Sequence, residues 1–166
     1  MPMESLHNIL QQLVEAHREL IDIGELKKEA LINNQVDLLN EQVNKETRLI
    51  RHITELEKQR LEAAMNFLIS RGYAPNPQVT LANLIQLVYK AADKQALQEI
   101  HAELLDVTSR LKQLQQLNND LLNHSMDYIE YSLNLMIGST DDDATYSDPS
   151  KRSQQVKRPG FFDTKA

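Results

Sequence analysis

The sequence predicts an all-α protein: an elongated antiparallel helical bundle of three long helices plus one short helix, with a disordered C-terminal tail. Three observations predict this fold class. Apolar residues recur at three- and four-residue steps, as on one face of an α-helix. Gly and Pro are scarce, with four and five residues in a chain of 166. The apolar period stops after Gly138, which gives two parts, a helical bundle over 1–138 and a flexible tail over 139–166.

The first two long helices are expected to form a hairpin. Apolar positions continue from Leu6 to Leu31, and the stretch "NNQVD" at 33–37 then interrupts them with residues that prefer turns and caps. A second apolar series starts at Leu38. Gly72 is a plausible left-handed cap for its end, and the two prolines of "YAPNPQ" stop any helix after it.

A short helix and a third long helix follow. Thr80 is expected to cap the short helix over 81–89, and Asp93 to cap the long one. The long helix carries a regular coiled-coil seam from Leu97 to Leu135 and should end at Gly138.

The tail raises a question of its own, because two of the three phenylalanines, Phe161 and Phe162, lie side by side in it. Its sequence is rich in Ser, Asp, Lys and Pro and has no apolar period. The Phe pair can fold back on an apolar surface of the bundle, dock on another component, or be incidental. The sequence leaves all three open.

Composition narrows the class of protein. The net charge of −6 argues against a nucleic-acid partner. The absence of Cys excludes disulfides, thiolate metal sites and cysteine nucleophiles. No apolar run is long enough to span a bilayer, and the start shows no secretory signal. We therefore expect a soluble cytoplasmic protein without membrane insertion.

Enzymatic chemistry is not expected either. Di-metal bundles need inward-facing Glu residues and Glu-x-x-His pairs, but only Glu4 and His7 have that spacing, at a helix end. Glu46 lies on a seam without a neighbouring His. No glycine loop can hold a phosphate, and no pocket is indicated for a Ser-His-Asp set. The sequence thus predicts no catalytic residues, no metal and no cofactor.

Polar residues interrupt the apolar seams, and two interpretations stay open. Buried polar groups can fix the register of packing, or an imperfect core can leave room for a partner helix. The residues concerned are His17, Gly24, Lys27, Glu46, Arg60 and Asn118.

The last helix is apolar over more than a coiled-coil seam requires. The excess predicts a partner-binding face, with homodimerisation and burial beneath the short helix as alternatives. The candidate residues for this face are Leu111, Leu114, Leu117, Asn118, Leu121, Leu122, Tyr128, Ile129, Leu133 and Met136.

Several motifs together resemble the FlgN-like flagellar export chaperones. They are the Leu-rich first helix with its turn before Glu46, "LEKQR" at 56–60, "LNNDLLNHS" in the last helix, "ATYS" around Thr145 and Tyr146, and the terminal "FFDTKA". The order and spacing of these motifs carry the resemblance over nearly the whole chain.

The resemblance implies a cytoplasmic, non-enzymatic chaperone. Its clients would be the C-terminal helical segments of the first and third hook-associated proteins of the hook–filament junction. It would keep them from associating early and deliver them to the export gate platform, with the export ATPase as a further partner. By the same resemblance Tyr146 is the gate-contact candidate. The rival class is a homodimeric coiled-coil adaptor without cargo.

Overall fold

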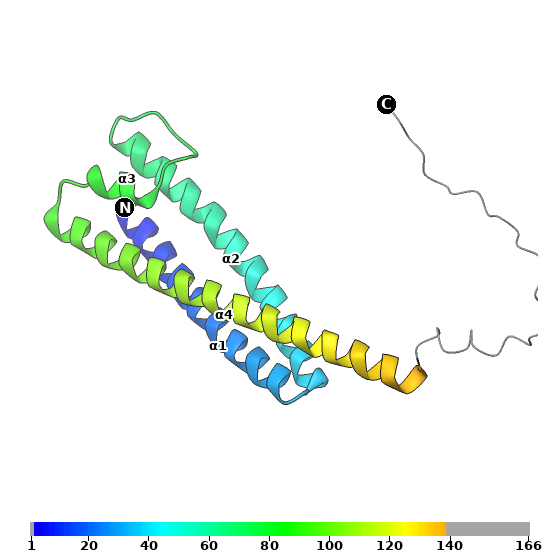
Figure 1. The fold of residues 1–166 in the computed structure, drawn as a ribbon. Helices are drawn as coiled ribbons and strands as arrows, with labels where there is room; N and C mark the ends of the chain where they lie inside the picture. Colours follow the sequence, from blue (N-terminus) through cyan, green and yellow to red (C-terminus); the bar gives the residue numbers. More distant parts are fainter. Residues whose placement is uncertain (1, 139–166) are drawn as a thin grey trace, which may run out of the picture. The chain divides into compact units, whose positions relative to one another are not determined.

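The computed structural model describes residues 2–138, and this part of the chain is helical without strands. It contains α1 (Pro2–Ile32), α2 (Val36–Ser70), α3 (Leu81–Gln86) and α4 (Ala91–Ile137) (Figure 1). The predicted all-α class, with three long helices and a short one, is confirmed. By its internal contacts the chain divides into two units, Met1–Met126 and Asp127–Ala166, which are described separately.

Helices α1 and α2 form an antiparallel hairpin closed by a very short turn. Asn34 adopts a left-handed conformation with φ 54°, and the Gln35 amide donates to the Ala30 carbonyl over 2.8 Å. Asparagine tolerates this conformation better than most residues. The predicted turn over 33–37 is confirmed in place. However, α2 begins inside it at Val36, because one left-handed residue is enough to reverse the chain.

The core of the first unit lies where the start of α1, the end of α2, the short α3 and the start of α4 meet. Burying large aliphatic side chains here supplies the main stabilising free energy, about 1.5–3 kcal/mol each. Helix α3 contributes Leu84 and Ile85 to this core. The largest fully buried side chains are Leu6, Leu10, Leu13, Val14, Leu84 and Leu97.

The local signals for helix ends are mostly confirmed. Helix α2 ends in a Schellman motif, in which Gly72 is left-handed with φ 80° and the Tyr73 amide donates to the Leu68 carbonyl. The Thr80 side chain accepts from the Asn83 amide over 3.2 Å and so caps α3, which ends at Gln86 rather than at 89.

The assignment of Asp93 as the N-cap of α4 is wrong. The helix begins two residues earlier, at Ala91, and Asp93 lies in its first turn. Its carboxylate is 3.5 Å from the Lys90 amine. A negative charge there is still favourable, because it faces the positive end of the helix dipole.

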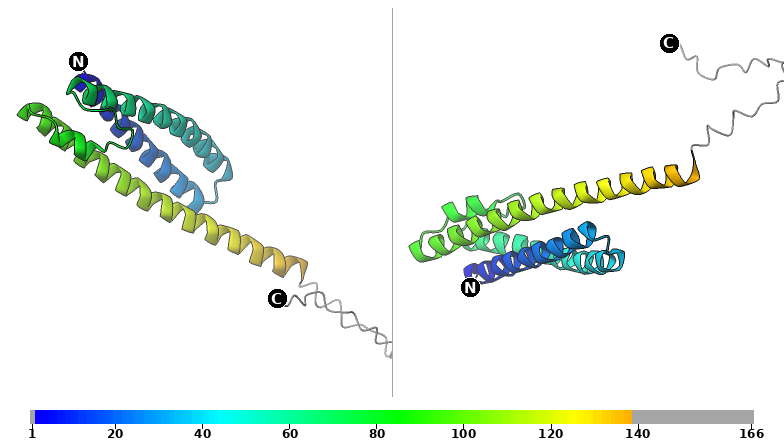
Figure 2. Two further views of the ribbon diagram at one scale, coloured as in Figure 1. Left: turned by 90° about the horizontal axis from the view of Figure 1, so that it is seen from above. Right: turned by 60° about the horizontal axis from the view of Figure 1, so that its bottom comes forward.

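Helix α4 packs on α1 in the first unit and runs in the same direction (Figures 1 and 2). An ion pair between Arg18 and Glu103 and a hydrogen bond between Asn118 and Gly24 join the two helices. At the other end α4 stops before Gly138, which is left-handed with φ 72°, as the sequence predicts. None of the described helices is long and apolar enough to cross a membrane.

Candidate protein-binding surface

The structure divides the predicted partner-binding face on α4 into an interior part and an exposed part. In the first unit, Leu114 and Asn118 are buried, and Asn118 is only 5% exposed. Leu111 and Leu121 are half-buried. Only Leu117 and Leu122 of this group are exposed. The expectation that Leu114 and Asn118 face a partner is therefore corrected: both belong to the packing of α4 on α1.

Gly24 explains why Leu114 and Asn118 are interior. The Asn118 side-chain amide donates to the Gly24 carbonyl over 2.8 Å. A Cβ atom on residue 24 would lie 2.6 Å from Cδ2 of Leu114. The two helices thus approach each other at a position where a side chain would collide with Leu114.

Other polar residues of the seams also find partners within the chain. The Lys27 amine lies 2.7 Å from a Glu46 carboxylate oxygen across the hairpin, and both side chains are mostly buried. His17 donates from Nδ1 to the Leu13 carbonyl over 2.7 Å. Arg60 pairs with Glu57 one turn before it. Of these contacts only the Lys27–Glu46 pair joins two helices, and it favours the interpretation that buried polar residues fix the register of the helices.

In the second unit, the last turns of α4 expose a dense set of apolar side chains. Seven of the eleven residues 127–137 are large and apolar or aromatic, and they are 49–84% exposed. This set includes the predicted residues Tyr128, Ile129, Leu133 and Met136, to which the structure adds Tyr131, Leu135 and Ile137.

Helix α2 carries an exposed stripe that was not predicted from the sequence, and we call it the α2 stripe. Its six residues recur at alternating steps of four and three, which places them on one face of the helix, and every one is exposed. A signal for it exists in the sequence, since the face is free of charge over five turns. The residues are Val36, Asn40, Val43, Thr47, Ile50 and Thr54.

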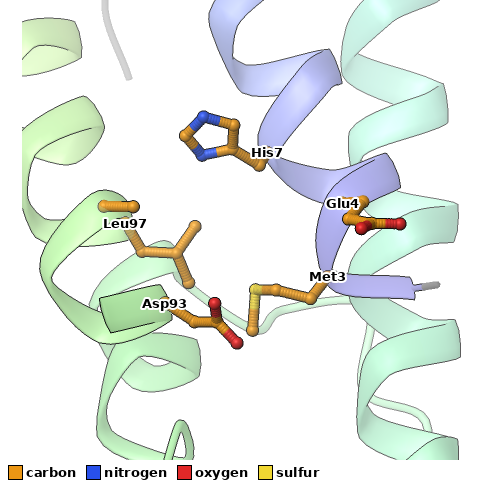
Figure 3. A pocket seen from close by; sticks show the side chains of 6 residues that line it. Met3, Glu4, His7, Asp93 and Leu97 are labelled. Carbon is orange, nitrogen blue, oxygen red and sulfur yellow. The ribbon is translucent and has the colours of Figure 1, made fainter. Parts of the chain in front are cut away.

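The Glu4–His7 pair does not build a metal site. It lines a hollow of about 250 Å³ together with Met3, Asp93 and Leu97 (Figure 3). Among the described residues, no group of three or more His, Cys, Asp or Glu side chains is placed to hold a metal ion. The hollow is bordered by apolar side chains as much as by polar ones.

Three residues with predicted roles, Tyr146, Phe161 and Phe162, lie outside the described residues.

Comparison with known proteins supplies the identity. The family model described as "FlgN protein" matches residues 1–154, which include all four helices. A Bacillus subtilis (strain 168) protein named "Uncharacterized protein YvyG" is 27% identical over 161 residues, covering 95% of this chain and 94% of that protein. No solved structure matches the chain. The chain therefore belongs to the FlgN family, the flagellar export chaperones for the hook-associated proteins.

Proposed function

We propose that this chaperone works in the cytoplasm and binds the C-terminal helical segments of the first and third hook-associated proteins. The exposed apolar side chains at the end of α4 form the binding surface. By covering the client's apolar stripe, the chaperone prevents early association of the client and keeps it ready for export. The family is not enzymatic, and binding without catalysis is all that this role requires.

The observation that carries the proposal is the exposure of the seven apolar residues within 127–137. Exposed apolar patches of this density usually mark interaction sites. An amphipathic client helix presents residues at the same three- and four-residue steps, so that the two surfaces can interlock. Tyr128 and Tyr131 suit such a surface, because tyrosine combines a large apolar area with a polar tip.

Leu117 and Leu122 in the first unit are a second exposed apolar feature of α4. We assign them to client binding as well, together with the half-buried Leu111 and Leu121. Leu114 and Asn118 are left out, since their side chains pack against α1.

The test compares two matched leucines of α4 in the full chain. Leu133 is 49% exposed and lies in the proposed surface, whereas Leu105 is 58% exposed and lies outside it. We expect Leu133→Ser to weaken the binding of a client C-terminal peptide about tenfold, which corresponds to roughly 1.4 kcal/mol. Leu105→Ser should leave the affinity unchanged. Equal affinities of the two variants in fluorescence anisotropy would show that the end of α4 is not the binding surface.

Delivery needs a second contact, and we propose that Tyr146 binds the export gate platform while the export ATPase is a further partner. Support comes from the family resemblance of the "ATYS" stretch. Tyr146→Ala should leave client affinity intact and lower secretion of both clients in cells. If secretion stays at the native level while the variant is expressed normally, Tyr146 is not the gate contact.

A cargo-free homodimeric adaptor is the rival function, and membership of a chaperone family argues against it. Light scattering with and without client peptide separates the two. A chaperone should form a complex with the peptide, whereas an adaptor should remain a tight dimer that ignores it.

A further inference from the structure

Helix α2 has two distinct faces, each with a seven-residue repeat. One repeat is buried against α1 and consists of Gln42, Leu49, Leu56 and Ala63. The other is Val36, Val43 and Ile50, and it is exposed. The two repeats are offset by one residue, or about 100° around the helix. A helix that packs on α1 through one repeat therefore keeps a second coiled-coil face that no helix of the described residues covers.

The exposed face is built to contact an apolar helix rather than water. The α2 stripe contains no charged residue over about 27 Å of helix, in a protein with 25% charged residues. Thr47 and Thr54 donate their hydroxyls to the Val43 and Ile50 carbonyls over 2.9 and 2.8 Å. With the hydroxyls engaged on their own helix, the threonine methyl groups are left to add apolar surface to the stripe.

Two ion pairs show on which side of the first unit the stripe lies. Arg18 pairs with Glu103 on one side of the contact between α1 and α4. Lys27 pairs with Glu46 across the contact between α1 and α2. Glu46 is about 40–80° around α2 from Val36, Val43 and Ile50. Around α4, Leu122 lies about 100° from Glu103. Glu103 is on one side of the contact between α4 and α1, and Leu122 is on the other side. The α2 stripe and Leu122 therefore border α1 from its two sides.

We infer that the α2 stripe is a second contact surface for the client's amphipathic helix, in addition to the one on α4. This inference rests on the proposed function. The client segment that it requires carries an uncharged apolar face of at least five helical turns, because a charged residue on that face would lose its hydration against the stripe without gaining a partner.

A second copy of the chain fits the stripe less well. Two parallel copies joined through it would place Asn40, Thr47 and Thr54 against polar residues of the same kind, and two antiparallel copies would bury Asn40 against an apolar residue of the other repeat. A client helix can instead place Leu or Ile against the threonine methyl groups and the valines. The composition of the stripe thus favours a foreign apolar helix.

The test uses two isoleucines of the same helix. Ile50 is 47% exposed and central in the stripe, while Ile69 is 56% exposed and lies outside it. In the full chain, Ile50→Glu should weaken binding of the client C-terminal peptide about tenfold or more, and Ile69→Glu should not. Ile50→Val should retain affinity. Circular dichroism and urea unfolding show that each variant folds, since both positions are already exposed.

Measuring the client affinity of Leu133→Ser in the same assay distinguishes a failure of this inference from a failure of the proposed function. If Leu133→Ser weakens binding and Ile50→Glu matches Ile69→Glu, the stripe is not a client contact and the proposed function stands. If neither Leu133→Ser nor Ile50→Glu weakens binding, both proposals fail. If light scattering shows a native dimer that Ile50→Glu converts to a monomer, the stripe belongs to a second copy and the inference is overturned.

A spin label distinguishes direct contact between the stripe and the client from indirect effects of a substitution. The chain has no cysteine, so Ile50→Cys and Ile69→Cys each carry a single spin label. The label at residue 50 should broaden the NMR signals of a bound client peptide strongly, and the label at 69 should broaden them several-fold less. Equal broadening from the two positions would contradict the inference.

Discussion

The side chain of Asn118 donates to the main-chain carbonyl of Gly24 over 2.8 Å, joining residues 94 positions apart in the sequence. This bond lies beside the contact of Gly24 with Leu114. Together they fix both the spacing and the register of α4 on α1.

Gly24→Ala should destabilise the protein despite the better helix propensity of alanine. The new methyl group would lie 2.6 Å from Leu114 Cδ2 and force the helices apart. Overpacking costs about 1–3 kcal/mol, against a propensity gain of about 1 kcal/mol. We expect a net loss of up to about 2 kcal/mol in urea unfolding. The double variant Gly24→Ala, Leu114→Ala should lose less than the sum of its parts. Strict additivity of the two changes would show that the contact is not what limits residue 24.

Asn118→Asp and Asn118→Leu should differ in their effect on the free energy of unfolding. Asp removes the donor and places a buried charge beside the Gly24 carbonyl, which should cost about 3 kcal/mol or more. The Asn118 Oδ1 atom is buried and has no hydrogen-bond partner among the described residues. Leu removes that unpaired oxygen, so its effect on the free energy of unfolding should stay within about 1 kcal/mol. If Asn118→Leu lowers the free energy of unfolding as much as Asn118→Asp does, the Asn118 amide contributes mainly to stability.

Lys27 and Glu46 should behave as a coupled pair. Their side chains are only 18% and 16% exposed, so removing one partner leaves the other charge partly desolvated. Lys27→Met and Glu46→Gln should each cost about 1–2 kcal/mol, and the double variant less than the sum. The pair Lys58 and Glu55 is the control, because both are largely exposed and should show a coupling near zero. Additive losses for Lys27 and Glu46 would contradict the coupling.

Removal of residues 139–166 tests the role of Phe161 and Phe162. If this pair covers the exposed apolar side chains of α4, the shortened chain should bind client peptide several-fold more tightly and bind more of a hydrophobic dye. If the pair docks on another component, client affinity should stay constant while secretion falls. Unchanged affinity, dye binding and secretion would make the pair incidental. Phe161→Ser, Phe162→Ser in the full chain should reproduce whichever result the deletion gives.

The turns and helix ends of the fold follow from the sequence because single residues determine them. Asn34, Gly72 and Gly138 adopt left-handed conformations that few other residues tolerate, and Thr80 supplies its own cap. Asp93 could not be placed correctly from sequence, since aspartate is favourable both at a cap and in the first turn of a helix. Only the tertiary structure decides between those two positions.

The candidate surface was harder to predict, because helical periodicity shows which residues share a face but not which face is covered. Leu114 and Asn118 continue the same seam as Tyr128 and Leu135, yet the first two pack against α1 while the last two are exposed. In α2 the buried and exposed repeats are offset by one residue, and both fall within the single apolar series that begins at Leu38. A single periodic series can therefore hide two faces with different partners.

The glycine at position 24 has a consequence for how this family can diverge. A larger residue at 24 meets the Leu114 side chain, and a smaller residue at 114 would let α1 and α4 keep their separation. In homologous chains we therefore expect residues 24 and 114 to change together, with a larger residue on one helix matched by a smaller one on the other. The pair then marks the shared helix spacing even where the surrounding sequence differs.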